Sequence, residues 1–157
     1  MVRNGKAKVY LETTIPSYLA ARPSRDLITA GHQQLTHLWW NRWRYEFDFF
    51  VSPLVWAEAQ RGDGDAAKRR SAILAEVPSL PVTANAEGLA ELLVSQGGIP
   101  HWSAADAGHI ALAAAHALDF LVTWNFRTST TRPRLPLYGR YAKTPAIAAP
   151  SYAHQKN

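Results

Sequence analysis

Residues Ala105 to Phe126, ADAGHIALAAAHALDFLVTWNF, give the clearest indication of the fold. The alanine-rich part, from Ser103 to Ala117, predicts a helix, and Asp119 to Thr123 (DFLVT) predicts a short buried strand directly after it. A helix that leads into a nearly all-apolar strand is typical of α/β proteins, whose parallel sheets are covered by helices on both faces.

The rest of the chain continues this alternation of strands and helices. Further short strands are predicted at Lys8–Leu11 (KVYL), Phe47–Val51 (FDFFV) and Leu80–Thr83. Further helices are predicted around Pro16, from a cap at Ser24 to about Arg44, from Ser52-Pro53 to near Gly62, over Asp65–Glu76 and over Asn85–Gln96. On the second of these helices the apolar residues fall mostly on one face, at Ile28, Leu35, Leu38, Trp39 and Trp43. The sequence therefore predicts a three-layer α/β domain with a central parallel sheet flanked by helices.

The composition limits the class of protein. The chain has 157 residues, 47% hydrophobic and 18% charged, which is enough apolar material for one folded domain. No run approaches the roughly 18 consecutive apolar residues of a membrane span, and Met1 to Tyr10 lacks the apolar segment of a secretory signal. The absence of cysteine excludes disulfides, a thiolate nucleophile and a cysteine-based zinc site. We expect a cytoplasmic protein without membrane contact.

Four polar residues stand near the predicted carboxyl ends of the strands. Glu12 directly follows the first strand, Asn125 follows the DFLVT strand, and Glu58 and Asp106 lie in early turns of two helices. In a parallel sheet these positions converge on one edge, where crowded carboxylates repel one another unless a cation lies between them. Oxygen ligands favour Mg²⁺ or Mn²⁺, and such an ion supports the hydrolysis of phosphodiesters. The pattern therefore predicts a metal-dependent hydrolytic site.

Each of these residues also has a structural interpretation. Asp106 could complete a capping box with the serine three positions before it, and Glu58 could form a surface ion pair with the arginine three positions after it. Glu12 could be a solvated turn residue, and Asn125 could form a turn after a strand. The four positions together favour a common site more than any one of them does alone.

Three motifs, in this order and spacing, resemble PIN-domain proteins. They are YLETTIPSYL (Tyr10 to Leu19), VSPLVWAEAQRGD (Val51 to Asp63) and the ADAGHIALAAAHALDFLVTWNF stretch quoted above. More narrowly, they resemble the VapC-like ribonuclease toxins of type II toxin–antitoxin pairs. The resemblance covers about residues 7–127 and implies a PIN-like domain over residues 1–127.

The resemblance also implies a function. It implies Mg²⁺- or Mn²⁺-dependent cleavage of RNA by metal-activated water, inhibition by a small cognate antitoxin, and a homodimer. It assigns the three catalytic, metal-binding acids to Glu12, Glu58 and Asp106, a fourth metal-binding position to Asn125, and supporting roles to Thr13, Thr14 and His109. Thr13 and Thr14 would orient ligand or substrate, and His109 would pack in the core or support the site indirectly.

One departure from the family pattern affects the chemistry. Most PIN domains have aspartate at the first acidic position, where this chain has Glu12. The extra methylene moves the carboxylate outward and adds a rotatable bond, whereas Mg²⁺ requires near-octahedral geometry. We expect the metal site to persist with an altered metal preference.

Residues 128–157 form an atypical tail. The family usually continues with a His/Asn segment, a helix and a last strand, whereas Pro133 and Pro136 oppose a helix here. When permitted codons are read from the third base of each codon, Arg127 to Thr131 can encode HINN. Tyr141 to Asn157 can then encode CENAGYRCPVICTPEE, which resembles the expected ending. We hypothesise that the tail is the product of a single-base frameshift, and incompatible codons in the gene would exclude this.

Part of the positive charge of the chain lies in the tail. The formal net charge is +5, which suits an anionic partner, but the segment from Phe120 to Asn157 holds six basic residues and no acidic one. A frameshifted tail has no selected role in RNA binding and would leave a sheet edge unpaired, because the final strand is lost. The remaining candidates for phosphate contact, or for a solvated face, are Arg22, Arg25, Arg42 and Arg44.

Two other functions compete with the nuclease. A degenerate PIN fold could bind antitoxin or RNA without cleaving it, and both Glu12 and the altered tail favour this alternative. A flavodoxin-like nucleotide or flavin binder would share the architecture. The first strand is followed by Glu12-Thr13-Thr14, however, and not by the glycine-rich phosphate loop that such a protein needs.

Overall fold

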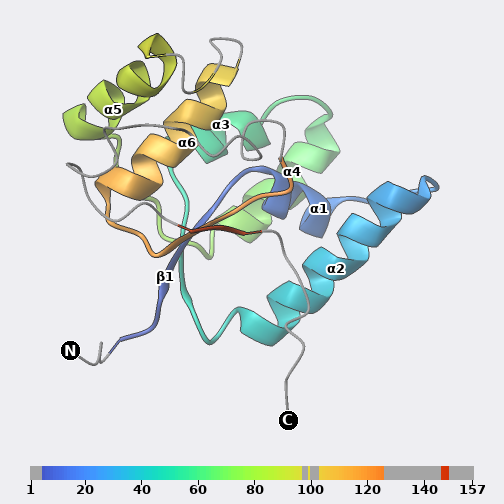
Figure 1. Ribbon diagram of the computed structural model, residues 1–157. Helices are drawn as coiled ribbons and strands as arrows, with labels where there is room; N and C mark the ends of the chain where they lie inside the picture. The colour runs from blue at the N-terminus through green and yellow to red at the C-terminus, as the bar shows by residue number, and fades with distance from the viewer. Residues whose placement is uncertain (1–4, 97–98, 100–102, 126–145, 149–157) are drawn as a thin grey trace.

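Strands and helices alternate along the chain in the computed structural model, which describes residues 5–96, 99, 103–125 and 146–148. The elements, drawn in Figure 1, are β1 (Lys8–Leu11), α1 (Thr14–Ala20), α2 (Leu27–Trp43), β2 (Asp48–Phe50), α3 (Pro53–Ala59), α4 (Gly64–Leu74), α5 (Ala84–Ser95), α6 (Ala104–Ala115), β3 (Phe120–Val122) and β4 (Ala146–Ala148). The α/β class predicted from the sequence is therefore confirmed.

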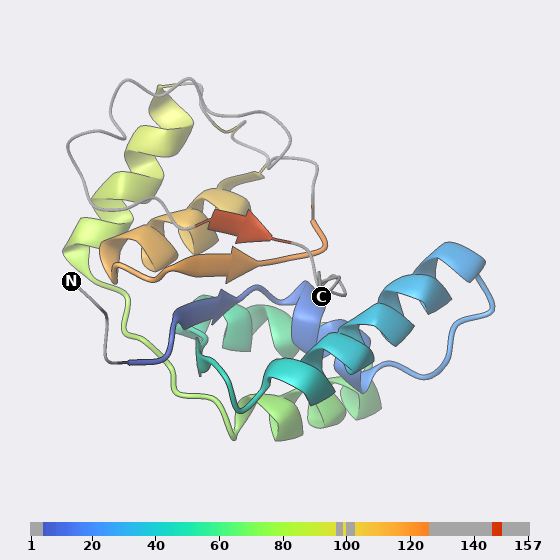
Figure 2. The same cartoon turned by 60° about the horizontal axis from the view of Figure 1, so that its bottom comes forward.

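The four strands form one parallel sheet in the order β2-β1-β3-β4. Tyr10 in β1 is in register with Phe50 on one side and Leu121 on the other, so β1 and β3 end at the same edge. The amide of Glu12 continues this ladder by donating to the carbonyl of Val122 over 3.1 Å. Figure 2 shows these strands side by side, and the chain entering α1 directly from the end of β1.

The core combines the strands with residues from all six helices, and α6 contributes the most buried positions of any helix. Seven residues of α6 are buried: Ala107, His109, Ile110, Ala111, Leu112, Ala113 and Ala114. Small side chains on this helix allow close contact with its neighbours: a Cβ added at Gly108 would lie 2.9 Å from Cδ2 of Leu54 in α3. This close approach brings His109 of α6 toward Glu58 of α3, so packing and site geometry depend on each other.

The N-terminal part of α2 differs from the prediction. Its cap is Asp26, whose carboxylate accepts from the amide of Thr29 over 2.8 Å, and not Ser24. The predicted apolar face is wrong at Ile28, Leu35 and Leu38, which are 72%, 38% and 37% exposed. The buried positions of α2 are Gln33, Thr36 and Trp39. In Figure 2 this end of α2 extends away from the sheet, so it has little core to cover.

The predicted strand at Leu80–Thr83 is also wrong. The chain there makes only an isolated bridge between Val51 and Ser79, and the amide of Leu80 donates to the carbonyl of Val51 over 2.8 Å. Thr83 is already the N-cap of α5, so the segment before it is too short for a strand. Among the described residues, no helix combines the length and hydropathy that a transmembrane helix needs.

The outer edge of β3 corrects a further expectation. We expected the altered tail to leave this edge unpaired, but Ala146–Ala148 forms β4 and pairs with Phe120–Val122 in parallel. Backbone groups alone make such a ladder, so three residues from an atypical segment suffice. The frameshift hypothesis itself concerns residues that lie, apart from β4, outside the described part of the chain, and it stays a prediction.

The contact at Gly108 gives a prediction about stability. Valine at this position would collide with Leu54, so we expect Gly108→Val to lower the free energy of unfolding by about 1–3 kcal/mol. Gly88 in α5 is the matched control because a Cβ there would meet nothing within 4 Å. Urea unfolding should show Gly88→Val unchanged or slightly more stable. Equal losses in both variants would contradict the close α3–α6 contact.

Candidate functional site

The sequence-predicted site residues meet at the edge where β1 and β3 end. Glu12 follows β1 and is only 7% exposed, whereas Glu58 reaches the same region from α3. Asp106 lies in the first turn of α6, and Asn125 follows β3. The convergence follows from the topology, because parallel strands place their carboxyl ends on one side.

Glu12 is held by three hydrogen bonds to one oxygen. Its Oε2 accepts from the amide of Thr14 over 3.0 Å, from the hydroxyl of Thr14 over 2.5 Å and from the hydroxyl of Thr123 over 2.9 Å. The Thr14 hydroxyl itself accepts from the amide of Trp124 over 2.9 Å, which fixes it as a donor toward Glu12. These bonds remove the extra rotational freedom that glutamate has relative to aspartate.

Glu58 is the second fixed carboxylate. Its Oε2 accepts from the Thr13 hydroxyl and is 3.0 Å from Nε2 of His109. Burial raises the pKa of Glu58, but the hydrogen bond and charge of His109, together with the Thr13 hydrogen bond, outweigh burial and lower this pKa overall. Glu58 therefore stays ionised at neutral pH. The surface ion pair with Arg61 is not formed, since the carboxylate is bonded to His109 and Thr13 instead.

A buried chain of hydrogen bonds supports His109 from behind. Nδ1 of His109 is 2.8 Å from the hydroxyl of Tyr10, which is 2.7 Å from the hydroxyl of Ser52. Burial raises the pKa of the Tyr10 phenol, so this hydroxyl keeps its proton at neutral pH. The ionised Glu58 carboxylate can only accept, so Nε2 of His109 donates to it. The chain of hydrogen bonds thus fixes the orientation of the His109 ring.

Glu12, Glu58 and His109 form a group that could hold a metal ion. One ligand atom from each of the three lies within 4.8 Å of the others. Two carboxylates at this distance suit a divalent cation, because the cation removes their mutual repulsion. Imidazole is a ligand for transition metals such as Mn²⁺, although Nε2 of His109 is already engaged with Glu58. The donor set therefore fits a divalent cation bound mainly through carboxylate oxygens.

Asp106 and Asn125 form the other part of the site. The Asn125 amide donates to Oδ1 of Asp106 over 2.8 Å, and its backbone amide donates to the Thr123 hydroxyl over 2.8 Å. Asp106 is thereby linked through Asn125 and Thr123 to Glu12, although it is not a member of the group within 4.8 Å. Ser103 occupies the cap position of α6 but makes no side-chain cap hydrogen bond.

Three residues of this network were not predicted from the sequence. Tyr10 and Thr123 sit at the ends of apolar strands, and Ser52 was interpreted only as a helix cap. Ser52 does occupy the cap position of α3, but its hydroxyl bonds to Tyr10 and makes no cap hydrogen bond. The available signal was burial of a hydroxyl group next to a predicted site residue, since such a group needs a partner.

Comparison with known proteins supports the fold. No protein-family model matches the chain, and no curated protein matches it. The chain is similar in structure to a chain in the crystal structure of VapBC2 from Rickettsia felis bound to a DNA fragment from their promoter. The match has a TM-score of 0.60 and 16% sequence identity, and it covers 90% of this chain and 98% of the other. The PIN-like α/β fold expected from the three sequence motifs is thus confirmed.

The buried hydrogen-bond chain gives a second prediction about stability. Tyr10→Phe would leave the Ser52 hydroxyl and Nδ1 of His109 without their shared partner, so the free energy of unfolding should fall by about 1–3 kcal/mol. Tyr18→Phe is the control, because no hydrogen bond of the Tyr18 hydroxyl occurs within the described residues. Chemical unfolding measures both. A Tyr10→Phe variant as stable as the wild type would contradict the chain.

The lowered pKa of Glu58 predicts a pH dependence in metal-free buffer. A carboxyl group whose pKa is lower in the folded state stabilises the protein above its unfolded pKa, about 4.3 for glutamate. This stabilisation is lost as the pH falls through the folded pKa. Urea unfolding in EDTA should therefore show a shallower loss of stability on acidification for Glu58→Gln than for the wild type. The exposed control Glu91→Gln should follow the wild type. If stability falls equally with pH in all three proteins, the lowered pKa of Glu58 is refuted.

Proposed function

We propose that this protein is a metal-dependent endoribonuclease that acts as the toxin of a VapC-like toxin–antitoxin pair. The observation that carries the proposal is the convergence of Glu12 and Glu58, with His109, on one buried corner of the sheet. The PIN-like fold and the three motifs that resemble VapC-like toxins support the same function.

Glu12 and Glu58 would hold Mg²⁺ or Mn²⁺ through their carboxylate oxygens. When bound, such an ion lowers the pKa of a coordinated water and stabilises the negative charge of a phosphodiester during hydrolysis. Oε2 of Glu12 already accepts three hydrogen bonds from Thr14 and Thr123. Oε1 would therefore be the oxygen that binds the ion. The site would thus bind its metal with a preorganised carboxylate.

The remaining residues have positioning roles in this proposal. Thr13 and His109 keep the Glu58 carboxylate ionised and oriented. Asn125 orients Asp106, which we propose as the third acid, facing the substrate side of the cluster. Thr13 and Thr14 act on the carboxylates, and so they would orient the metal ligands rather than the substrate itself.

We further propose a cognate antitoxin, a homodimer and action on RNA in the cytoplasm. The structure of VapBC2 from Rickettsia felis, bound to DNA, is the comparison that supports an antitoxin partner. A small upstream reading frame that overlaps this gene, and whose product copurifies with this chain, would support the pairing. Co-expression with that product should restore growth of cells in which this chain is toxic.

The nuclease is tested by cleavage of RNA. With Mg²⁺ or Mn²⁺ the purified protein should cleave RNA, and EDTA should abolish cleavage. We expect Glu12→Gln and Glu58→Gln to lose more than about 100-fold in rate, because loss of outer-shell partners alone costs about 10–100-fold. Asp106→Asn should lose activity to a similar extent. Glu91→Gln is the control, since this exposed residue lies on α5 away from the site.

A structural observation adds to the two sequence features that favour the non-catalytic alternative. Asp106 is bonded to Asn125 and is outside the group of Glu12, Glu58 and His109. A protein that binds Mn²⁺ in calorimetry but cleaves no RNA would be the degenerate PIN-fold module. Full activity of Glu58→Gln or Asp106→Asn would refute the proposed site.

A further inference from the structure

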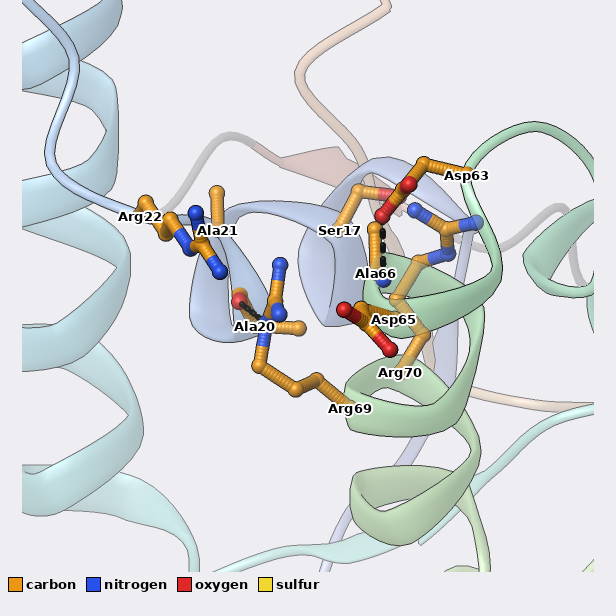
Figure 3. Close-up of a pocket in the computed structure, with 9 residues that line it drawn as sticks. All are labelled: Ser17, Ala20, Ala21, Arg22, Asp63, Asp65, Ala66, Arg69 and Arg70. Carbon is orange, nitrogen blue, oxygen red and sulfur yellow. Dashed lines mark hydrogen bonds between the residues drawn. The ribbon is translucent and has the colours of Figure 1, made fainter.

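A cavity of about 430 Å³ opens between the C-terminal end of α1 and the first turns of α4. Figure 3 shows its lining, in which Arg22, Arg69 and Arg70 contribute three guanidinium groups and Asp63 and Asp65 two carboxylates. The formal charge of the lining is therefore +1. This cavity is separate from the Glu12–Glu58 cluster and is not used by the proposed mechanism.

Hydrogen bonds to backbone carbonyls hold two of the arginine side chains. Nε of Arg69 donates to the carbonyl of Ala20 over 2.9 Å. Arg70 donates twice, from Nε to the carbonyl of Ala59 over 2.7 Å and from Nη2 to the carbonyl of Arg61 over 2.6 Å. The side chain of Gln33 is buried and bonds to the Arg22 carbonyl over 3.0 Å, which fixes the backbone of Arg22. Because the side chains of Arg69 and Arg70 are already held, binding a ligand to them would cost little additional ordering.

The two guanidinium groups of Arg22 and Arg69 point toward one another beside Ala20 (Figure 3). In the part of the chain that the structure describes, none of the three arginines forms an ion pair with a carboxylate. Asp63 is engaged as the cap of α4, where it accepts from the amide of Ala66 over 2.9 Å, and Asp65 lies 4.0 Å from Lys68. The guanidinium groups of Arg22 and Arg69 converge without an ion pair to a carboxylate, and this arrangement favours an anion in the space beside them.

Phosphate is the anion that this arrangement fits best. Guanidinium groups bind phosphate oxygens through paired N–H donors. Among the described residues, both Nη atoms of Arg69 and Nη1 of Arg70 make no hydrogen bond, whereas Nη2 of Arg70 donates to the carbonyl of Arg61 over 2.6 Å.

The cavity is joined to the acidic cluster by two short elements. Thr13 and Thr14 contact the two carboxylates at the start of α1, and Ala20 at its end bonds to Arg69, about 10 Å further along the helix. Ala59, which bonds to Arg70, directly follows Glu58. A phosphate in the cavity would thus lie at the opposite end of α1 from the acidic cluster.

We propose that Arg22, Arg69 and Arg70 form a phosphate-binding subsite for the backbone of a single-stranded RNA, beside the acidic cluster. This inference rests on the proposed function for its choice of RNA as the ligand. The subsite would position the strand and would not take part in the chemistry, since phosphate contacts fix register without reading sequence.

The test is the affinity for RNA in EDTA, where cleavage cannot interfere. Fluorescence anisotropy with a short 5′-labelled single-stranded RNA should show a loss of about tenfold for Arg22→Gln, and a larger loss for Arg22→Gln/Arg69→Gln. The slope of log affinity against log salt should fall by about 0.7 for each phosphate contact removed. Lys68→Gln removes one charge from the same helix outside the cavity, and its affinity should change less than about twofold.

Stability and anion controls make the result decisive. Arg22 is exposed and its side chain makes no hydrogen bond in the described region, so Arg22→Gln should unfold at the wild-type temperature. Unchanged RNA affinity in the folded double variant would overturn the subsite, as would an equal loss in Lys68→Gln. Inorganic phosphate that matches RNA in affinity would identify a small-anion site and also overturn it.

The nuclease and the subsite can fail separately. Glu58→Gln should keep its RNA affinity in EDTA while losing cleavage, because it lies outside the cavity. A wild-type protein that binds RNA through the arginines but never cleaves it would contradict the proposed nuclease and support the subsite. Cleavage lost in Glu58→Gln, with RNA affinity insensitive to the arginines, would do the reverse.

Discussion

Two carboxylates in one buried corner are the constraint on which this structure depends. Glu12 and Glu58 lie within 4.8 Å of each other, so if both are ionised they repel by about 3 kcal/mol at an effective dielectric constant of 20. Hydroxyl groups of Thr13, Thr14 and Thr123 and the imidazole of His109 donate to them, which offsets part of this cost. A cation between the carboxylates would remove most of the remainder. Such a cluster costs folding free energy if its only role is structural, but it is well suited to bind a metal ion.

The fold supplies this arrangement through backbone placement and close packing. Parallel pairing of β1 with its two neighbours brings the ends of β1 and β3 together, and the Glu12 amide completes the ladder to Val122. The contact between Gly108 and Leu54 then brings α6 close enough to α3 for His109 to reach Glu58. Stability and ligand geometry thus share the same contacts, and a substitution that separates α3 from α6 should weaken both.

The sequence predicted the parts of this structure that depend on local pattern. Strands at Lys8–Leu11 and Phe120–Val122 have β-rich apolar residues, and Glu12 directly follows the first of them. Long-range partners carry no such signal: nothing in the sequence near Tyr10 indicates that its hydroxyl bridges Ser52 and His109. The apolar face of α2 was wrong because periodicity reports a hydrophobic stripe but not whether a core lies opposite it, as the exposure of Ile28 demonstrates. Both Asp26 and Ser24 are residue types that cap helices, and their positions in the sequence do not show which of them caps α2.

The acidic cluster and the arginine cavity lie at the two ends of α1, and we propose that the first binds a metal ion and the second a phosphate. The central claim is that a divalent ion binds between the two carboxylates. Anomalous diffraction from crystals grown with Mn²⁺ tests this claim most directly. The account predicts a peak between the carboxylates of Glu12 and Glu58 in the wild type, and no peak there in Glu58→Gln crystals. Mn²⁺ bound only at other carboxylates, with this corner empty at saturating concentration, would contradict it.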